Sequence, residues 1–98
     1  MRVLHLNQAL ADERRELDFW KGRRPELGEE FLDELYKAID TIAKAPEGYA
    51  HASKRTQLRR FVEKRFQTAI LYRYSKEEDL LIIALVYNCR MDPKRFLS

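Results

Sequence analysis

The clearest periodic pattern in the chain is an apolar stripe between residues 25 and 45. Its members recur mostly at intervals of three or four residues, which is the spacing of one face of an α-helix. Pro25 suits the first turn of such a helix, and Glu26 places negative charge near its positive dipole end. Pro46 and Gly48 end the pattern. The stripe consists of Leu27, Phe31, Leu35, Ala38, Ile39, Ile42 and Ala45.

A second and weaker helical pattern covers Gln8 to about Lys21. We expect Asn7 to be its N-cap, because a short polar side chain can accept a backbone N–H at that position. Gly22 and Pro25 separate this helix from the next one. The short connection predicts an antiparallel helical hairpin, with the second helix as its inner arm. The apolar residues expected to share a face of the first helix are Leu10, Leu17 and Trp20.

Four other segments are expected to form β-strands. The last of them, Leu80–Tyr87, is a run of eight apolar residues bounded by charge, which is typical of a strand covered on both faces. In the third, alternate side chains face opposite ways, with Tyr72 on one face and Leu71 on the other. Residues 47–55 are expected to be a loop and residues 75–79 a charged hairpin turn. The expected strands are Arg2–Leu6, Thr56–Phe61, Thr68–Tyr74 and Leu80–Tyr87.

These elements follow the order β-α-α-β-β-β. Helices that cover one face of a mostly antiparallel sheet define an α+β fold, so we expect a helical hairpin packed on such a sheet. The chain has 98 residues, enough to bury one core, and we expect a single domain over residues 1–98.

Composition excludes several classes of site. With three glycines, the chain carries no Gly-rich phosphate-binding loop. Its single cysteine, Cys89, cannot pair internally, and with only His5 and His51 beside it the chain cannot supply a cysteine-based zinc site. No stretch has the length of a transmembrane helix, and the apolar N-terminus is too short for a signal peptide. We therefore expect a cytoplasmic protein without metal, cofactor or membrane contact.

The net charge of +3 hides an uneven distribution. Residues 12–47 hold eleven acids and seven bases, whereas residues 54–73 hold seven bases and one acid. The predicted helices are therefore acidic and the strands after them are basic. Cationic side chains on a rigid sheet suit an anionic partner, either a nucleic acid or an acidic protein segment.

Short motifs occur in four stretches of the chain, one in each helix, one in the basic strands and one near the C-terminus. Together and in this order they resemble the ParE/RelE superfamily of small bacterial toxins, which belong to type II toxin–antitoxin and plasmid stabilisation modules. The ParE-like branch is the closer match. The motifs are Ala9 with Phe19-Trp20; Leu27-Gly28, Phe31, Leu35, Ala38, Ile42 and Pro46; Arg59-Arg60, Arg65-Phe66 and Ile70-Leu71-Tyr72; and Arg90, Asp92-Pro93 and Phe96.

The resemblance implies a toxin that inhibits DNA gyrase by binding it, without enzymatic activity, and that a cognate antitoxin neutralises. The antitoxin is expected in a groove between the helical hairpin and the sheet, where an acidic amphipathic segment would suit Arg59, Arg60, Arg65 and Arg73. The residues expected to bind a partner are Arg59, Arg60, Arg65, Arg73, Arg90, Lys94, Arg95 and Phe96.

The alternative implied by the same resemblance is a metal-independent endoribonuclease of the RelE type, which cleaves mRNA on the ribosome. Such cleavage needs cations around the phosphorane and a pair of proton shuttles. Tyrosine, with a pKa near 10, is a poor base, and the sequence shows no clear acid–base pair. The residues expected to act in a nuclease are Arg60, Arg65, Arg73, Arg90 and Tyr87.

The chain departs from the family motifs mainly near its C-terminus, where toxicity in the family is often concentrated. A third alternative is therefore a non-toxic relative that acts as a protein-binding module. The departures are Gln67 in place of proline, Asn88 in place of histidine, Cys89 in place of glycine, Met91 in place of arginine and Phe96 in place of tryptophan.

Other polar and aromatic residues are expected to be structural. The arginine pairs of the helices should lie on solvated faces, balanced by Glu13, Glu16 and Glu26. Tyr36 is expected to pack in the core or the hairpin, and Cys89 to be a small buried residue.

Overall fold

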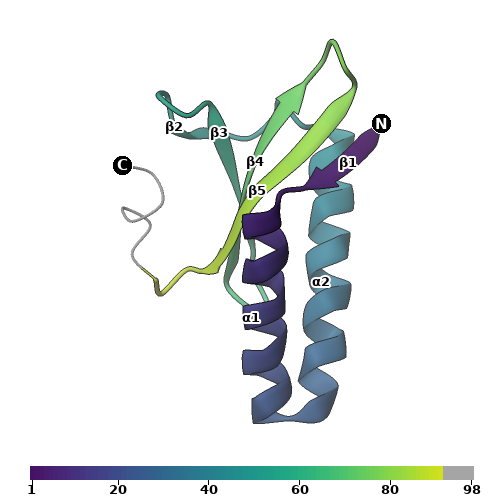
Figure 1. Cartoon of the computed structure of the whole chain (residues 1–98), viewed down its shortest axis with the longest axis vertical. Coiled ribbons are helices and arrows are strands. Elements are labelled where there is room, and N and C mark those ends of the chain that lie inside the picture. The colour runs from purple at the N-terminus through teal and green to yellow at the C-terminus, as the bar shows by residue number, and fades with distance from the viewer. Residues whose placement is uncertain (92–98) are drawn as a thin grey trace.

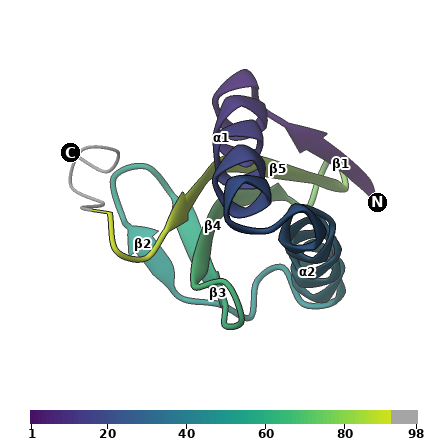
Figure 2. The same ribbon diagram turned by 90° about the horizontal axis from the view of Figure 1, so that it is seen from below.

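Two long helices pack side by side against one face of a five-stranded sheet (Figures 1 and 2). The computed structural model describes residues 1–91. This α+β arrangement confirms the expected fold class. The elements are β1 (Arg2–His5), α1 (Asn7–Arg23), α2 (Pro25–Lys44), β2 (His51–Ser53), β3 (Leu58–Glu63), β4 (Thr68–Ser75) and β5 (Leu80–Asn88).

The strands lie in the order β1-β5-β4-β3-β2. Strand β1 pairs parallel with β5, and the other three pairings are antiparallel. The apolar run of β5 follows from this position, because the strand has a neighbour on each side and α1 over one face. Leu81, Ile83 and Val86 are fully buried under the helices.

The helical hairpin has a one-residue connection. Helix α1 continues through Gly22 to Arg23, and Arg24 is extended, with φ −154°, before Pro25 begins α2. Proline disfavours a helical conformation at the residue before it, which explains the break at Arg24. The expected N-cap is wrong: Leu6 occupies that position, and Asn7 is the first helical residue.

Helix α2 buries the predicted stripe, with Phe31, Leu35 and Ile42 each at most 1% exposed. Helix α1 differs from its prediction, since Leu10 is 51% exposed and Ala9 is the residue that enters the core. Tyr36 of α2 is also exposed rather than packed in the core.

The sheet contains one element that the sequence did not indicate. Residues 47–55 include β2, which forms an irregular pairing with β3 that joins His51 to Arg59. A three-residue strand is too short for an alternating pattern, which explains why this segment was expected to be a loop. Strand β3 also begins later than expected, at Leu58.

The three hairpin turns share one local design. They span residues 53–57, 63–67 and 75–79, and the last residue of each has a positive φ between 51° and 61°. In each turn the first side chain accepts the backbone N–H of the fourth residue. The first two turns carry Lys-Arg at their second and third positions. The repeated geometry therefore displays a basic pair at each end of β3. The accepting residues are Ser53, Glu63 and Ser75.

Apolar side chains form a layer on each face of the sheet. Ile70 and Tyr72 face the helices, whereas Ala69 and Leu71 pack in the second layer, as the alternation in β4 predicted. The register shifts between Leu71 and Tyr72, which pair with Leu85 and Ile83, so Ala84 of β5 is an extra residue. This β-bulge lets Ala84 and Leu85 both contribute to the second layer.

Candidate functional site

Two adjoining hollows lie where the end of β5 meets α1 and the turn between β3 and β4. Each has a volume of about 310–320 Å³, and both are lined by Asn88 and Arg90. We call them together the Arg90 groove. The first is lined by Trp20, Arg65, Phe66, Gln67, Asn88, Cys89 and Arg90, and the second by Arg15, Glu16, Phe19, Asn88, Arg90 and Met91.

A buried amide orients Arg90. The Asn88 Oδ1 atom accepts the backbone N–H of Arg90 at 2.9 Å and its Nε–H at 3.1 Å. Asn88 is itself 8% exposed, and its Nδ2 donates to the carbonyl of Phe66 at 3.3 Å. These bonds fix one edge of the Arg90 guanidinium. Within residues 1–91, its terminal nitrogens form no hydrogen bond, and Arg90 lines both hollows. Asn88 therefore positions the Arg90 side chain.

Arg65 projects from the hairpin turn between β3 and β4. Its Nη2 donates to Oε1 of Glu30 on α2 at 2.9 Å, and its guanidinium lies 4.9 Å from the ring centre of Phe66. The hydrogen bond with Glu30 raises the pKa of the Arg65 guanidinium. The carboxylate of Glu63 accepts the backbone N–H groups of Arg65 and Phe66, at 2.6 and 2.9 Å, and so rigidifies the turn.

Arg60 approaches the same region from the other face of the sheet. It pairs with Leu71 across the strands, and its Nη2 lies 3.9 Å from Sγ of Cys89. The backbone N–H of Cys89 donates to the carbonyl of Gln67 at 2.8 Å. Cys89 is half-buried rather than buried as expected. Cys89 lines the first hollow together with Arg65 and Arg90, so Arg60 contacts a residue of the groove without lining it.

The other predicted cations lie elsewhere. Arg59 uses Nη1 to donate to the carbonyls of Glu47 and Tyr49, at 3.2 and 2.6 Å, and so holds the segment before β2 against the sheet. Arg73 is exposed on β4, on the sheet face that also carries Arg60. Arg59 and Arg73 therefore lie apart from the Arg90 groove.

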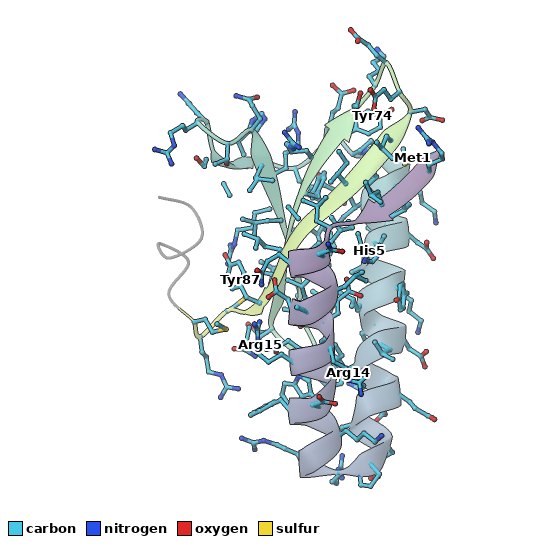
Figure 3. The ribbon with its side chains drawn as sticks, in the orientation of Figure 1. Met1, His5, Arg14, Arg15, Tyr74 and Tyr87 are labelled. Atoms are coloured by element: carbon cyan, nitrogen blue, oxygen red, sulfur yellow. The ribbon has the colours of Figure 1, made fainter. Side chains whose placement is uncertain are left out.

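The remaining predicted residues do not add to the groove. Tyr87 is 1% exposed and packs in the second apolar layer, at the end of β5 (Figure 3). Lys94, Arg95 and Phe96, with the Asp92-Pro93 motif, lie outside the described residues.

Helix α1 contributes three acidic residues to its buried face. The arginines of the helical hairpin are exposed as expected, and Glu16 and Glu26 each approach one of them, Arg15 and Arg24, at 3.5 Å. The expectation is wrong for Glu13, which pairs with His5 instead. Asp12, Glu13 and Glu16 are themselves buried, at 1%, 6% and 6% exposed. The Arg14 side chain lies on the other side of α1 from that of Arg15 (Figure 3). A sequence signal did exist, because Ala9, Asp12, Glu13, Glu16 and Trp20 follow helical spacing and mark the face that is buried.

These carboxylates have distinct roles. Glu13 contacts Nδ1 of His5 at 2.5 Å, and Asp12 accepts hydrogen bonds from Gln8, Arg15 and the backbone of β5. Glu16 faces the second hollow of the Arg90 groove. Burial raises its pKa, and nearby Arg15 offsets this effect in part. The groove therefore combines oriented guanidinium groups with one poorly solvated carboxyl group.

Residues 1–91 contain neither a metal site nor a membrane-spanning helix. Within this range no group of three or more histidine, cysteine, aspartate or glutamate residues is arranged to hold a metal ion. Neither helix is long and apolar enough to cross a membrane.

Comparison with known proteins gives a structural match alone. No protein-family model and no curated protein matches the sequence. One similar chain belongs to the solved structure "Chromosomal ParDE TA system from P. aeruginosa"; the TM-score is 0.75 at 14% identity, over 90% of this chain and 95% of that chain. At this identity the match establishes the fold. The chain therefore shares the fold of a chain of this ParDE structure, in agreement with the fold that the order of its motifs predicted.

Proposed function

We propose that this protein is the toxin of a type II toxin–antitoxin module and inhibits growth by binding DNA gyrase through the Arg90 groove. The observation that carries the proposal is the orientation of Arg90 by the buried amide of Asn88, in a hollow that Arg65 and Cys89 also line, with Arg60 in contact with Cys89. A guanidinium held in place loses less entropy on binding than a free one. The fold shared with a chain of a ParDE toxin–antitoxin structure supports the same function.

We further propose that a cognate antitoxin neutralises the protein by occupying the hollow between α2 and β3. This hollow has a volume of about 320 Å³, and Lys37, Lys64 and Arg65 line it together with Glu34 and Glu63. Three cations against two acids favour an acidic segment. Of the four arginines expected to meet the antitoxin, Arg65 lines this hollow.

The edge of β3 offers backbone groups to the same segment. Strand β2 pairs with Leu58 and Arg59, and the N–H of Arg60 donates to the carbonyl of Ala50. Within residues 1–91, no strand pairs with this edge beyond that point. An extended antitoxin segment could therefore add to the sheet along Val62.

The proposal is tested by expressing the protein with and without its antitoxin and by assaying gyrase supercoiling in vitro. We expect growth arrest and loss of supercoiling for the native protein. The triple substitution Arg60→Ala, Arg65→Ala and Arg90→Ala should abolish both. A control with the same loss of charge on exposed positions of the helical hairpin, Arg14→Ala, Arg24→Ala and Lys44→Ala, should abolish neither.

Three outcomes would contradict the proposal. Harmless expression of the native protein would exclude a toxin and favour a protein-binding module. Rapid loss of intact mRNA with supercoiling unaffected would replace gyrase with the ribosome as the target. Toxicity that survives the triple substitution would exclude the Arg90 groove as the binding surface.

A further inference from the structure

The second hollow of the Arg90 groove has features of a small-molecule site. Its lining combines the apolar side chains of Phe19 and Met91 with the carboxyl group of Glu16 and the guanidinium of Arg90. We call it the Glu16 pocket. Its volume of about 310 Å³ lies at the lower end of the range for ligand pockets.

Glu16 retains hydrogen-bonding capacity inside this pocket. The residue is 6% exposed, and its closest ion-pair contact is a long one, 3.5 Å from Oε2 to Nε of Arg15. The terminal nitrogens of Arg15 are directed elsewhere, to Asp12 at 3.1 Å and to the carbonyl of Val86 at 3.3 Å. A carboxylate has about four lone-pair sites, and a buried one is normally well hydrogen-bonded. Besides its contact with Arg15, the Glu16 carboxylate can therefore accept hydrogen bonds from a ligand in this pocket.

We propose that the Glu16 pocket binds the base of a guanine nucleotide, with the Glu16 carboxylate accepting the N1–H and 2-amino groups and Arg90 contacting the phosphate. Guanine presents two adjacent donors on one edge, which match the two oxygens of a carboxylate. Adenine and cytosine place an acceptor nitrogen next to their amino group, and uracil flanks its single N–H with carbonyls. Each would set an acceptor against one carboxylate oxygen.

The rest of the pocket suits the remainder of a nucleotide. Phe19 is 42% exposed and, with Met91, supplies apolar surface for the face of a base. Asn88 fixes the Nε edge of Arg90, so the terminal nitrogens are available to a phosphate. Arg65 lies in the adjoining hollow and can meet a second phosphate group.

The inference is independent of gyrase and antitoxin binding, because its readout is nucleotide affinity alone. It is tested by titrating the full chain with 5′-GMP, 5′-IMP and 5′-AMP, using calorimetry and amide chemical shifts. We expect GMP to bind most tightly, IMP more weakly because it lacks the 2-amino group, and AMP at least about tenfold more weakly than GMP. The comparison of GMP with IMP needs no change to the protein.

Variants locate the site. Glu16→Gln keeps the shape of the side chain but removes one acceptor oxygen, and should weaken GMP binding about tenfold or more. The matched control Glu29→Gln, on an exposed position of α2, should leave it unchanged. Phe19→Ala alters an exposed ring and should weaken GMP and AMP by similar factors. The affinity for a guanine-containing tetranucleotide is compared with the affinity for GMP. Tighter binding of the tetranucleotide would show that the pocket takes a guanine within a nucleic-acid strand, and tighter binding of GMP that it takes the free nucleotide.

Equal affinities for GMP, IMP and AMP would overturn the inference, as would no saturable binding at millimolar GMP. GMP affinity unaffected by Glu16→Gln in a folded variant would also overturn it. If that variant does not fold, the comparison of GMP with IMP on the native protein decides. Growth arrest or its absence has no bearing on any of these outcomes.

Discussion

The carboxylate of Asp12 on α1 accepts the backbone N–H of Val86 on β5 at 3.0 Å, across 74 positions of the chain. The pairing of β1 with β5 stops at Ile83, which leaves the next part of that strand edge without a neighbouring strand. Asp12 satisfies the Val86 N–H that no strand pairs there, and Arg15 donates to the carbonyl of the same residue at 3.3 Å. Two helical side chains thus replace a strand and dock α1 on the sheet.

Asp12→Ala should destabilise the protein by about 3 kcal/mol. The substitution leaves the buried Val86 N–H without its acceptor and removes one carboxylate partner of the half-exposed Arg15 guanidinium. Urea unfolding followed by circular dichroism measures the free energy. Asp12→Asn retains one acceptor oxygen and should cost less than Asp12→Ala. A loss below about 1 kcal/mol for Asp12→Ala would show that the docking contact contributes little.

Tyr72→Phe should destabilise the protein by about 1 kcal/mol. The buried hydroxyl of Tyr72 donates to the carbonyl of Pro46 at 2.8 Å and ties the end of the hairpin to the sheet. Burial raises the pKa of Tyr72 to about 12, so the native protein favours the neutral phenol. The stability that the native state gains from the neutral Tyr72 phenol is therefore fully present below pH 10 and is lost as the pH rises toward 12.

The difference in unfolding free energy between wild type and Tyr72→Phe, measured from pH 8 to pH 11, checks this prediction. The wild type should lose its advantage at the alkaline end, because its unfolded state releases the phenolic proton first. A difference that stays constant with pH would contradict the assigned pKa.

The two helical glycines should respond to alanine in opposite ways. A Cβ atom at Gly28 would lie 3.1 Å from Leu17 Cδ1 and 3.1 Å from Lys21 Cβ, where α1 and α2 approach closely. Overpacking there should outweigh the gain in helix propensity, so Gly28→Ala should cost about 1 kcal/mol. Gly22 has no atom within 4 Å of the same position, and Gly22→Ala should stabilise by about 0.5–1 kcal/mol.

Thermal unfolding of both variants tests this pair of predictions. Both substitutions add one methyl group to a helix of the same hairpin, so each is the control for the other. Stabilisation by both would mean that α1 moves away at little cost.

The fold was predictable where one element carries one clear signal. Helix α2 buries an unbroken apolar stripe, and β5 is a continuous apolar run, so both were placed correctly. Helix α1 buries Ala9 among three acidic residues, and apolar periodicity alone selected the exposed Leu10 instead. Strand β2 is shorter than any pattern that alternation could reveal.

The candidate site was predictable in its residue types and not in its grouping. Sequence located the cations, but the Arg59 guanidinium is engaged by backbone carbonyls and Arg65 by Glu30, 35 positions away. Such contacts depend on tertiary packing that no local pattern encodes. The burial of Glu16 was not predicted, because residue type alone does not distinguish a glutamate that lines a hollow from one that faces water.

Glu16→Gln should stabilise the protein at pH 7, and this gain should disappear near pH 4. Burial raises the pKa of Glu16 above 4.5, with Arg15 and Arg90 opposing this effect and Asp12 adding to it. The native state therefore holds the proton more tightly than the unfolded state, and ionisation of Glu16 lowers stability as pH rises through the raised pKa. Glutamine cannot ionise and escapes this cost. Unfolding of both proteins in urea from pH 4 to pH 8 measures the difference, with Glu29→Gln as the exposed control. A Glu16→Gln variant that is less stable than wild type at pH 7 would show that the ion pair with Arg15 outweighs the burial of the carboxylate.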